Sequence, residues 1–186
     1  MLEHRGDMWL LAHQLKADAV CITTNGYVRR DGSAVLGRGC ALEAYKRWPS
    51  LVTILGEQIK TSGVKVSRLT DLGMHRQDEG RSQLEYHLVA FPVKPAKAYG
   101  APDRSNIVAH MRRKPFPGNV VPGCFVVAKM DIIERSCTQL MKLIEAMGWS
   151  AVLLPRPGCG AGGLDWDEVK PVIEPFLDDR VVVVTY

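Results

Sequence analysis

Near the end of the chain, residues 151–166 read AVLLPRPGCGAGGLDW. An apolar run stops at Pro155, a loop with four glycines follows, and Asp165 has the character of a helix N-cap, with Glu168 completing a capping-box pattern. A strand, a glycine loop and a helix N-terminus in this order turn backbone N–H groups towards an anion, because glycine has no Cβ to block the approach. The stretch therefore favours a phosphate-binding loop, and tight packing of the connection is the alternative interpretation.

A second glycine loop follows an earlier strand-like run. Residues 19–24 are almost continuously apolar and end at Asn25, which is typical of a strand covered on both faces. Further on, the tripeptide 37–39 (GRG) precedes a run over residues 40–48 whose apolar positions recur at helical spacing. The third glycine of a dinucleotide fingerprint is missing, so nicotinamide binding is not expected. Two such loops can clasp a diphosphate between them.

The rest of the pattern alternates strands with helices. The expected strands cover residues 1–5, 19–24, 64–70, 86–93, 151–154 and 181–184, and the expected helices cover residues 8–16, 40–48, 51–59, 131–147 and 166–177. Residues 107–109 and 124–128 are expected to pair as a hairpin. The alternation predicts an α/β fold, a three-layer α/β/α domain with a central mixed sheet, and the length of 186 residues fits a single domain.

Composition limits the classes of function. The chain is 46% apolar and 24% charged, as in an ordinary soluble globule, and no apolar run approaches the roughly 20 residues that a membrane span needs. The N-terminus also lacks the apolar segment of a secretory signal. The five cysteines are scattered and form no CxxC pair or Cys/His cluster, which predicts reduced thiols and a cytoplasmic location. We expect no metal site, no cofactor and no membrane partner.

Positive charge gathers in one segment, residues 94–129. The segment holds seven Lys or Arg and one Asp, a local charge of +6, whereas the whole chain carries +4. Such a segment is a candidate for contact with the phosphates of DNA or RNA, and a solvated hairpin is the alternative. Its basic residues include Lys97, Arg104, Arg112, Arg113 and Lys114.

Four motifs fall in one recognisable order: Gly6-Asp7-Met8, the strand that ends at Asn25, the GRGCAL run at 37–42, and residues 155–166. In order and spacing they resemble the macrodomain family, which binds ADP-ribose and many of whose members hydrolyse ADP-ribosyl linkages. The likeness covers most of a single macrodomain spanning residues 1–186, and about 98–129 are expected to be a basic insertion.

Within that family the sequence is similar to the branch of the terminal ADP-ribose glycohydrolase and the DNA ADP-ribosyl glycohydrolase antitoxins. The GCGAGGLDW run at 158–166 resembles the antitoxin form of the motif, and the FPVK run at 91–94 resembles the strand end that carries the catalytic lysine of this branch. Gly162 stands where the protein glycohydrolase carries an aspartate, and Asp165 is an N-cap rather than a substitute. This departure argues against removal of glutamate-linked ADP-ribose and leaves hydrolysis on nucleic acid open.

The resemblance implies a role for individual residues. Asp7 would accept a hydrogen bond from the adenine amino group, Asn25 would hold the distal ribose, and Lys94 would attack the anomeric carbon of that ribose. The alternatives are a self-capping turn for Asp7, turn chemistry for Asn25 and a surface position for Lys94. The expected ligand-binding residues are Asp7, Met8, Asn25, Gly37, Arg38, Gly39, Gly158, Cys159, Gly160, Ala161 and Gly162.

Two further residues have weaker roles. Cys159 lies between glycines, but no His stands at a recognisable position beside it, so a small and partly buried residue is favoured over a nucleophile. Tyr186 could lie against the adenine or fray as a chain end. The expected function is binding of ADP-ribose with hydrolysis of ADP-ribosyl linkages on nucleic acid or protein. A non-catalytic ADP-ribose reader and an ADP-ribose 1″-phosphate phosphatase remain as alternatives.

Overall fold

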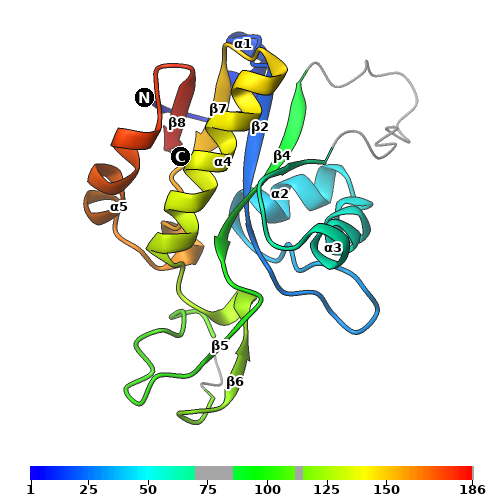
Figure 1. Ribbon diagram of the computed structural model, residues 1–186, viewed down its shortest axis with the longest axis vertical. Helices are drawn as coiled ribbons and strands as arrows, with labels where there is room; N and C mark the ends of the chain where they lie inside the picture. The colour runs from blue at the N-terminus through cyan, green and yellow to red at the C-terminus, as the bar shows by residue number, and fades with distance from the viewer. Residues whose placement is uncertain (70–85, 112–114, 186) are drawn as a thin grey trace.

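The computed structural model describes residues 1–69, 86–111 and 115–185 (Figure 1). Its centre is a six-stranded sheet in the order β1-β8-β7-β2-β4-β3. The strands are β1 (Leu2–Arg5), β2 (Ala19–Asn25), β3 (Ser67–Arg68), β4 (His87–Lys94), β7 (Val152–Pro155) and β8 (Val181–Thr185). All neighbouring strands are parallel except β3, which is antiparallel to β4. The predicted mixed sheet is confirmed, and the parallel strands end at one common edge.

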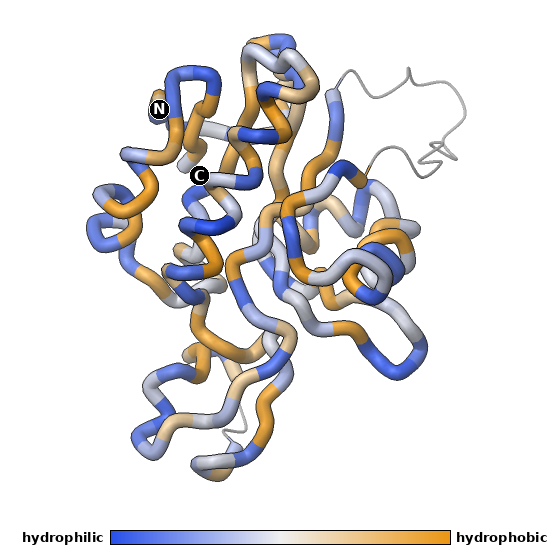
Figure 2. Tube along the Cα trace, in the orientation of Figure 1, coloured by the Kyte–Doolittle hydropathy of each residue, from blue (hydrophilic) through white to orange (hydrophobic). Residues whose placement is uncertain are grey.

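Helices cover both faces of this sheet. They are α1 (Met8–Gln14), α2 (Gly39–Arg47), α3 (Leu51–Ser62), α4 (Met130–Met147) and α5 (Trp166–Ile173). Successive strand residues point to opposite faces, so Val20 and Ile22 pack in the core with α1, α2 and α3, whereas Ala19 and Cys21 pack in the core with α4 and α5. Figure 2 shows hydrophobic and hydrophilic residues alternating along the helices, as one buried face requires.

The ends of the helices follow from local sequence. The Asp165 side chain accepts a hydrogen bond from the N–H of Asp167, which confirms it as the N-cap of α5. Gly148 ends α4 in the left-handed conformation, with φ of 65°. None of the described helices is long and apolar enough to cross a membrane.

The predicted hairpin is placed wrongly. Residues 107 and 126 share only an isolated bridge, and residues 123–125 form a 3-10 turn, whereas β5 (Lys97–Tyr99) pairs with β6 (Val120–Pro122). The cause is Gly123, whose N–H donates to the carbonyl of Ala96 at 2.8 Å. A Cβ at Gly123 would lie 1.7 Å from the carbonyl oxygen of Pro95, so only glycine lets the two backbones meet here.

The strand predicted at 64–70 is also shorter in the described part of the chain, where it covers only Ser67–Arg68. The N–H of Val66 donates to the side chain of Gln139 at 2.9 Å, so this part of the chain is tied to α4 instead. The polar stretch DEGR at residues 78–81, which separates the strands predicted at 64–70 and 86–93, lies outside the described residues.

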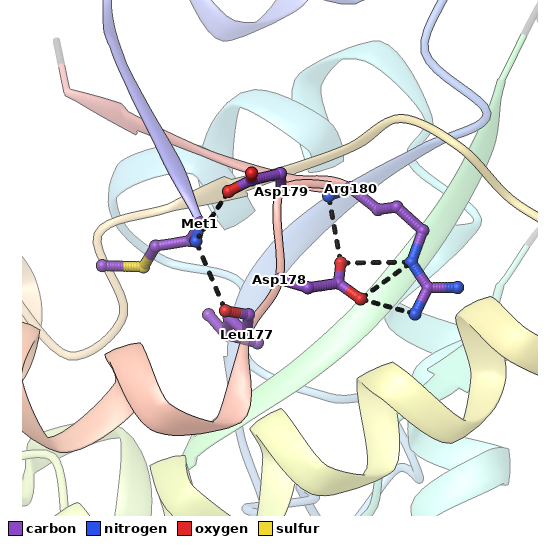
Figure 3. A network of polar contacts seen from close by, with 5 residues as sticks. All are labelled: Met1, Leu177, Asp178, Asp179 and Arg180. Atoms are coloured by element: carbon purple, nitrogen blue, oxygen red, sulfur yellow. Dashed lines mark hydrogen bonds and ion pairs between the residues drawn. The ribbon is translucent and has the colours of Figure 1, made fainter.

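The edge formed by β1 is tied to the turn before β8 (Figure 3). The amino group of Met1 donates to the carbonyl of Leu177 and pairs with Asp179, both at 3.3 Å. Arg180 forms a bidentate contact with Asp178, with the shortest distance 2.6 Å. The Met1 contacts therefore hold the start of β1 against the start of β8, at the edge of the sheet opposite to the one where the parallel strands end.

Candidate functional site

A cavity of about 570 Å³ opens where β2, β4, β7 and β8 end. Parallel strands direct their carboxyl ends to one edge, which is where α/β sheets bind ligands. Four adjacent strands at a spacing of about 4.8 Å place the ends of β4 and β8 roughly 14 Å apart. A cavity of this length and volume suits a nucleotide-sized ligand. Both predicted glycine loops line it, over residues 37–41 and 158–162.

The second glycine loop needs glycine for two different reasons. Gly158 has φ of 78°, and a Cβ there would meet Ile133 at 2.8 Å and Leu164 at 2.9 Å, so it is closely packed. Gly160 has φ of 61° and nothing within 4 Å of its Cβ position, so its backbone is open to approach. Gly158 therefore fits the packing interpretation of the loop, and Gly160 leaves open backbone, which the phosphate-binding interpretation requires.

Lys94 is buried at the end of β4, with only 7% of its surface exposed. Its Nζ donates a hydrogen bond to the carbonyl of Ala161, at 2.9 Å, so the lysine lies directly under the second glycine loop. Loss of hydration on burial lowers the pKa of Lys94 to about 8, opposed by a weaker electrostatic effect of Cys124. A surface lysine, the alternative reading of the sequence, is therefore excluded.

Asn25 ends β2 and stands in register with Lys94, after a shift in the pairing of the two strands. Its amide nitrogen donates to the carbonyl of Val35 at 2.8 Å, and its amide oxygen accepts from the N–H of Tyr27 at 3.0 Å. Asn25 thus makes the turn contacts and also lines the cavity. One N–H and one lone pair of its amide are left for a ligand.

Arg38 lies between the two glycines of the first loop and lines the same cavity, with an exposed side chain. Behind it the buried thiol of Cys40 lies 3.3 Å from the hydroxyl oxygen of Thr23 and accepts the N–H of the same residue at 3.4 Å. These contacts attach the start of α2 to the end of β2 and so fix the loop against the sheet.

Cys159 is half-buried, and its thiol lies 3.7 Å from the carbonyl oxygen of Pro157. Burial raises its pKa to about 11, so the thiol is protonated at neutral pH and a poor nucleophile. This agrees with the interpretation of Cys159 as a small, partly buried residue. All five cysteines are free.

Asp7 and Met8 are not among the residues that line the cavity. Met8 is fully buried in the core, and Asp7 caps α1 by accepting the N–H groups of Trp9 at 2.8 Å and Leu10 at 3.0 Å. The N–H of Gly6 donates to Thr185, which does line the cavity, so Asp7 stands next to that wall. Tyr186, Arg112, Arg113 and Lys114 lie outside the described residues.

The sequence did not single out Arg156, which follows β7 and lines the cavity. Its guanidinium carbon lies 4.7 Å from the centre of the Trp166 ring, and one of its terminal nitrogens is 3.5 Å from the carboxylate of Glu3. Its Nε is buried and makes no hydrogen bond to any described residue. Because Trp166 and Glu3 are far from Arg156 in sequence, only its position directly after a strand signalled a role.

The segment predicted as an insertion also contributes to the wall. His110, Cys124 and Phe125 line the cavity close to the end of β4. The sequence did not predict these three residues, because their position at the cavity depends on the β5–β6 hairpin, and the sequence predicted a different pairing for that hairpin.

A mixed sheet with helices on both faces and two glycine loops over the carboxyl ends of its strands defines the macrodomain fold. Solved structures agree: the macrodomain of Mycobacterium tuberculosis DarG has a TM-score of 0.61 at 20% identity, covering 100% of this chain and 97% of that one. The structure of Thermosipho africanus DarTG in complex with ADP-ribose has a TM-score of 0.62 at 15% identity, covering 99% of this chain and 41% of that one. The predicted three-layer macrodomain fold is confirmed.

Among curated proteins, the chain is 25% identical to the DNA ADP-ribosyl glycohydrolase of Mycobacterium tuberculosis over 136 aligned residues. These residues cover 73% of this chain. The protein of that name from Mycobacterium bovis matches equally. The chain spans about 30% of the length of these relatives. No protein-family model matches the sequence.

Proposed function

We propose that this protein binds ADP-ribose and hydrolyses the bond that links it to a target, with Lys94 as the catalytic residue. The observation that carries the proposal is a lysine with a pKa of about 8 buried beneath a glycine loop at one end of a nucleotide-sized cavity. Similar proteins support the proposal: two are DNA ADP-ribosyl glycohydrolases, and one similar structure was solved in complex with ADP-ribose.

The ligand would lie across the carboxyl ends of the four strands. The diphosphate fits between the two glycine loops, where the first N–H groups of the helical turn at Gly160–Gly162 have no partner within that turn. The distal ribose then lies between Asn25 and Lys94. The adenine lies at the β8 end, beside Thr185 and within reach of the Asp7 and Met8 backbone.

The proposed chemistry is a double displacement at the anomeric carbon. The neutral amine of Lys94 attacks this carbon and forms a C–N bond, while the bond to the target breaks and the target leaves with the bonding electrons and a proton. Water then cleaves the new C–N bond, which releases ADP-ribose and restores the amine. A pKa of about 8 keeps a useful fraction of the amine neutral near physiological pH.

We further propose that the target is a nucleic acid that contacts the basic segment at 94–129. Lys97 and Arg104 are exposed on this segment, which also supplies part of the cavity wall. We also propose that residues of about 98–129 form an insertion in a single macrodomain. The five free thiols support a reducing, cytoplasm-like compartment. Replacing Arg112 and Arg113 should weaken binding of the modified nucleic acid with a smaller dependence on salt. Unchanged binding would argue against this contact.

A reader that binds ADP-ribose without turnover is the second candidate. It is favoured by the hydrogen bond from Lys94 to Ala161, which gives the lysine a purely structural task.

Titration calorimetry with ADP-ribose, ADP and NAD tests the binding site, and selective micromolar binding of ADP-ribose is expected. Lys94→Ala should then bind ADP-ribose but lose hydrolysis of ADP-ribosylated DNA, while Lys94→Arg, with no neutral form at working pH, should also be inactive. The ribosylamine formed on Lys94 can open its ring to an imine, and cyanoborohydride added during turnover should reduce this imine and leave ADP-ribose on Lys94, detectable by peptide mass spectrometry. Equal turnover by the Lys94→Ala variant and the parent protein would refute the lysine mechanism.

A further inference from the structure

The β5–β6 hairpin presents one apolar face to solvent. Tyr99 and Val120 are opposite each other in the pairing and are 73% and 55% exposed. The next pair along, Ala98 and Val121, points the other way and packs with a small core around Val126. The hairpin therefore packs on the protein through the face of Ala98 and Val121, and the face of Tyr99 and Val120 is not needed for this packing. Figure 1 shows this hairpin projecting from the rest of the molecule beyond the end of β4.

Phe116 is a second exposed aromatic residue, in the turn that packs against the end of this hairpin. It is 75% exposed, and with Tyr99 it is one of the two most exposed large apolar side chains among the described residues. Its carbonyl accepts the N–H of Asn119 in a turn, and the carbonyl of Asn119 accepts the N–H of Gly100 at 2.9 Å. A Cβ on Gly100 would lie 3.4 Å from the carbonyl oxygen of Phe116, so the turn packs directly against the residue that follows Tyr99. We call Tyr99, Phe116 and Val120 the hairpin face.

The hairpin is anchored at the rim of the cavity. The N–H of Gly26 donates to the carbonyls of Lys94 and Pro95, both at 3.2 Å, and Gly123 donates to Ala96 at 2.8 Å. Tyr99 follows Lys94 by five residues, so the two Cα atoms are at most about 17 Å apart. A nucleic-acid strand whose ADP-ribosylated base lies at Lys94 spans this distance of about 17 Å with about five stacked nucleotides.

Exposed aromatic side chains amid positive charge match one kind of partner. Aromatic rings stack on unpaired bases of any sequence, and Lys or Arg contact the backbone between them. The segment that carries the hairpin face has both, since Lys97, two residues before Tyr99 in β5, and Arg104 are exposed, and the sequence from Lys94 to Lys129 has a net charge of +6. An uncharged apolar surface of a partner protein would gain nothing from this excess of charge.

We propose that the hairpin face is a stacking platform, on which Tyr99 and Phe116 bind unpaired bases that flank the ADP-ribosylated nucleotide held in the cavity. This inference rests on the proposed function, because it needs a nucleic acid that carries ADP-ribose. In this proposal, stacking on the hairpin provides the affinity for the nucleic acid, and the glycine loops bind ADP-ribose.

The test compares two ligands across matched variants. Tyr99→Ser/Phe116→Ser is expected to weaken binding of a short single-stranded oligonucleotide carrying one ADP-ribosylated base by at least about tenfold, since each stacked base contributes roughly fivefold or more. The affinity for free ADP-ribose should stay that of the parent protein. Tyr99→Trp/Phe116→Trp should retain the oligonucleotide affinity. Leu10→Ser/Phe176→Ser, which removes two exposed apolar side chains elsewhere, serves as the control and should have no effect.

Three results would overturn the proposal: an unchanged oligonucleotide affinity, a loss that the control variant shares, or an equal loss for ADP-ribose. Sedimentation tests the rival occupant, a second copy of the chain. If the parent protein self-associates and the serine variant does not, while the oligonucleotide affinity is unchanged, the hairpin face is a dimer contact. A parent protein that does not bind ADP-ribose would refute the proposed function itself. A parent that binds ADP-ribose, with a serine variant equal to it on the oligonucleotide, would refute the stacking platform alone.

Discussion

Replacement of Lys94 by Met removes a titrating group from the interior while keeping a side chain of similar length. Burial holds the pKa of Lys94 at about 8 in the folded protein, against 10.5 for the exposed group. Between these two values the unfolded chain binds more protons than the folded one, so the free energy of unfolding of the parent rises with pH. The Met variant lacks this contribution.

The magnitude follows from the two pKa values. At pH 7 the buried charge costs about 3 kcal/mol of stability, and at pH 10 the cost falls to about 1 kcal/mol, if the whole shift is expressed. The stability of the parent relative to Lys94→Met should therefore rise by about 2 kcal/mol between these pH values. Loss of the hydrogen bond to Ala161 displaces the whole difference curve but contributes much less to its slope.

Urea denaturation of both proteins at a series of pH values between 7 and 10 measures this difference. Other titrating groups act on both proteins and cancel. Parallel stability curves would show that Lys94 is not desolvated in the folded state, and the proposed origin of its reactivity would fail with that result.

Three other predictions concern the rate, the hairpin and the cavity wall. Hydrolysis should become faster as pH rises and level off above about 8, because the neutral amine of the buried lysine reacts; a flat profile would contradict this. Gly123→Ala should destabilise the fold by about 3 kcal/mol or more, because its Cβ would overlap the carbonyl oxygen of Pro95, whereas Gly100→Ala should cost less than about 1 kcal/mol in the same denaturation assay. Arg156→Lys should lose the planar contact with Trp166 and about 1 kcal/mol of stability, and an unchanged denaturation midpoint would show that this contact contributes nothing.

Much of the fold could be predicted from the sequence because its signals are local. Apolar runs such as residues 19–24 mark strands buried on both faces, and Asp165 and Gly148 mark helix ends through contacts with their immediate neighbours. The hairpin failed for the opposite reason. Residues 107–109 and 124–128 have stronger strand propensity, but the pairing is decided by Gly123, which brings distant backbones together.

The candidate site divides in the same way. The glycine loops could be found because composition and order along the chain reveal them. The burial of Lys94 depends on a loop 67 residues away, so no local pattern contains it, and the family resemblance alone pointed to this lysine. Arg156 was missed because its contacts, Trp166 and Glu3, come from the start of α5 and from the first strand.

The cavity is assembled from strands that contribute to its two ends separately. One end depends on β7 and β8, whereas the end that holds Lys94 depends on β4 and on the segment that follows it. If the cavity binds ADP-ribose as proposed, a change in the hairpin alters contacts at the β4 end and leaves the contacts at the β8 end in place. The two ends of the cavity can therefore vary independently, because no single element builds both of them.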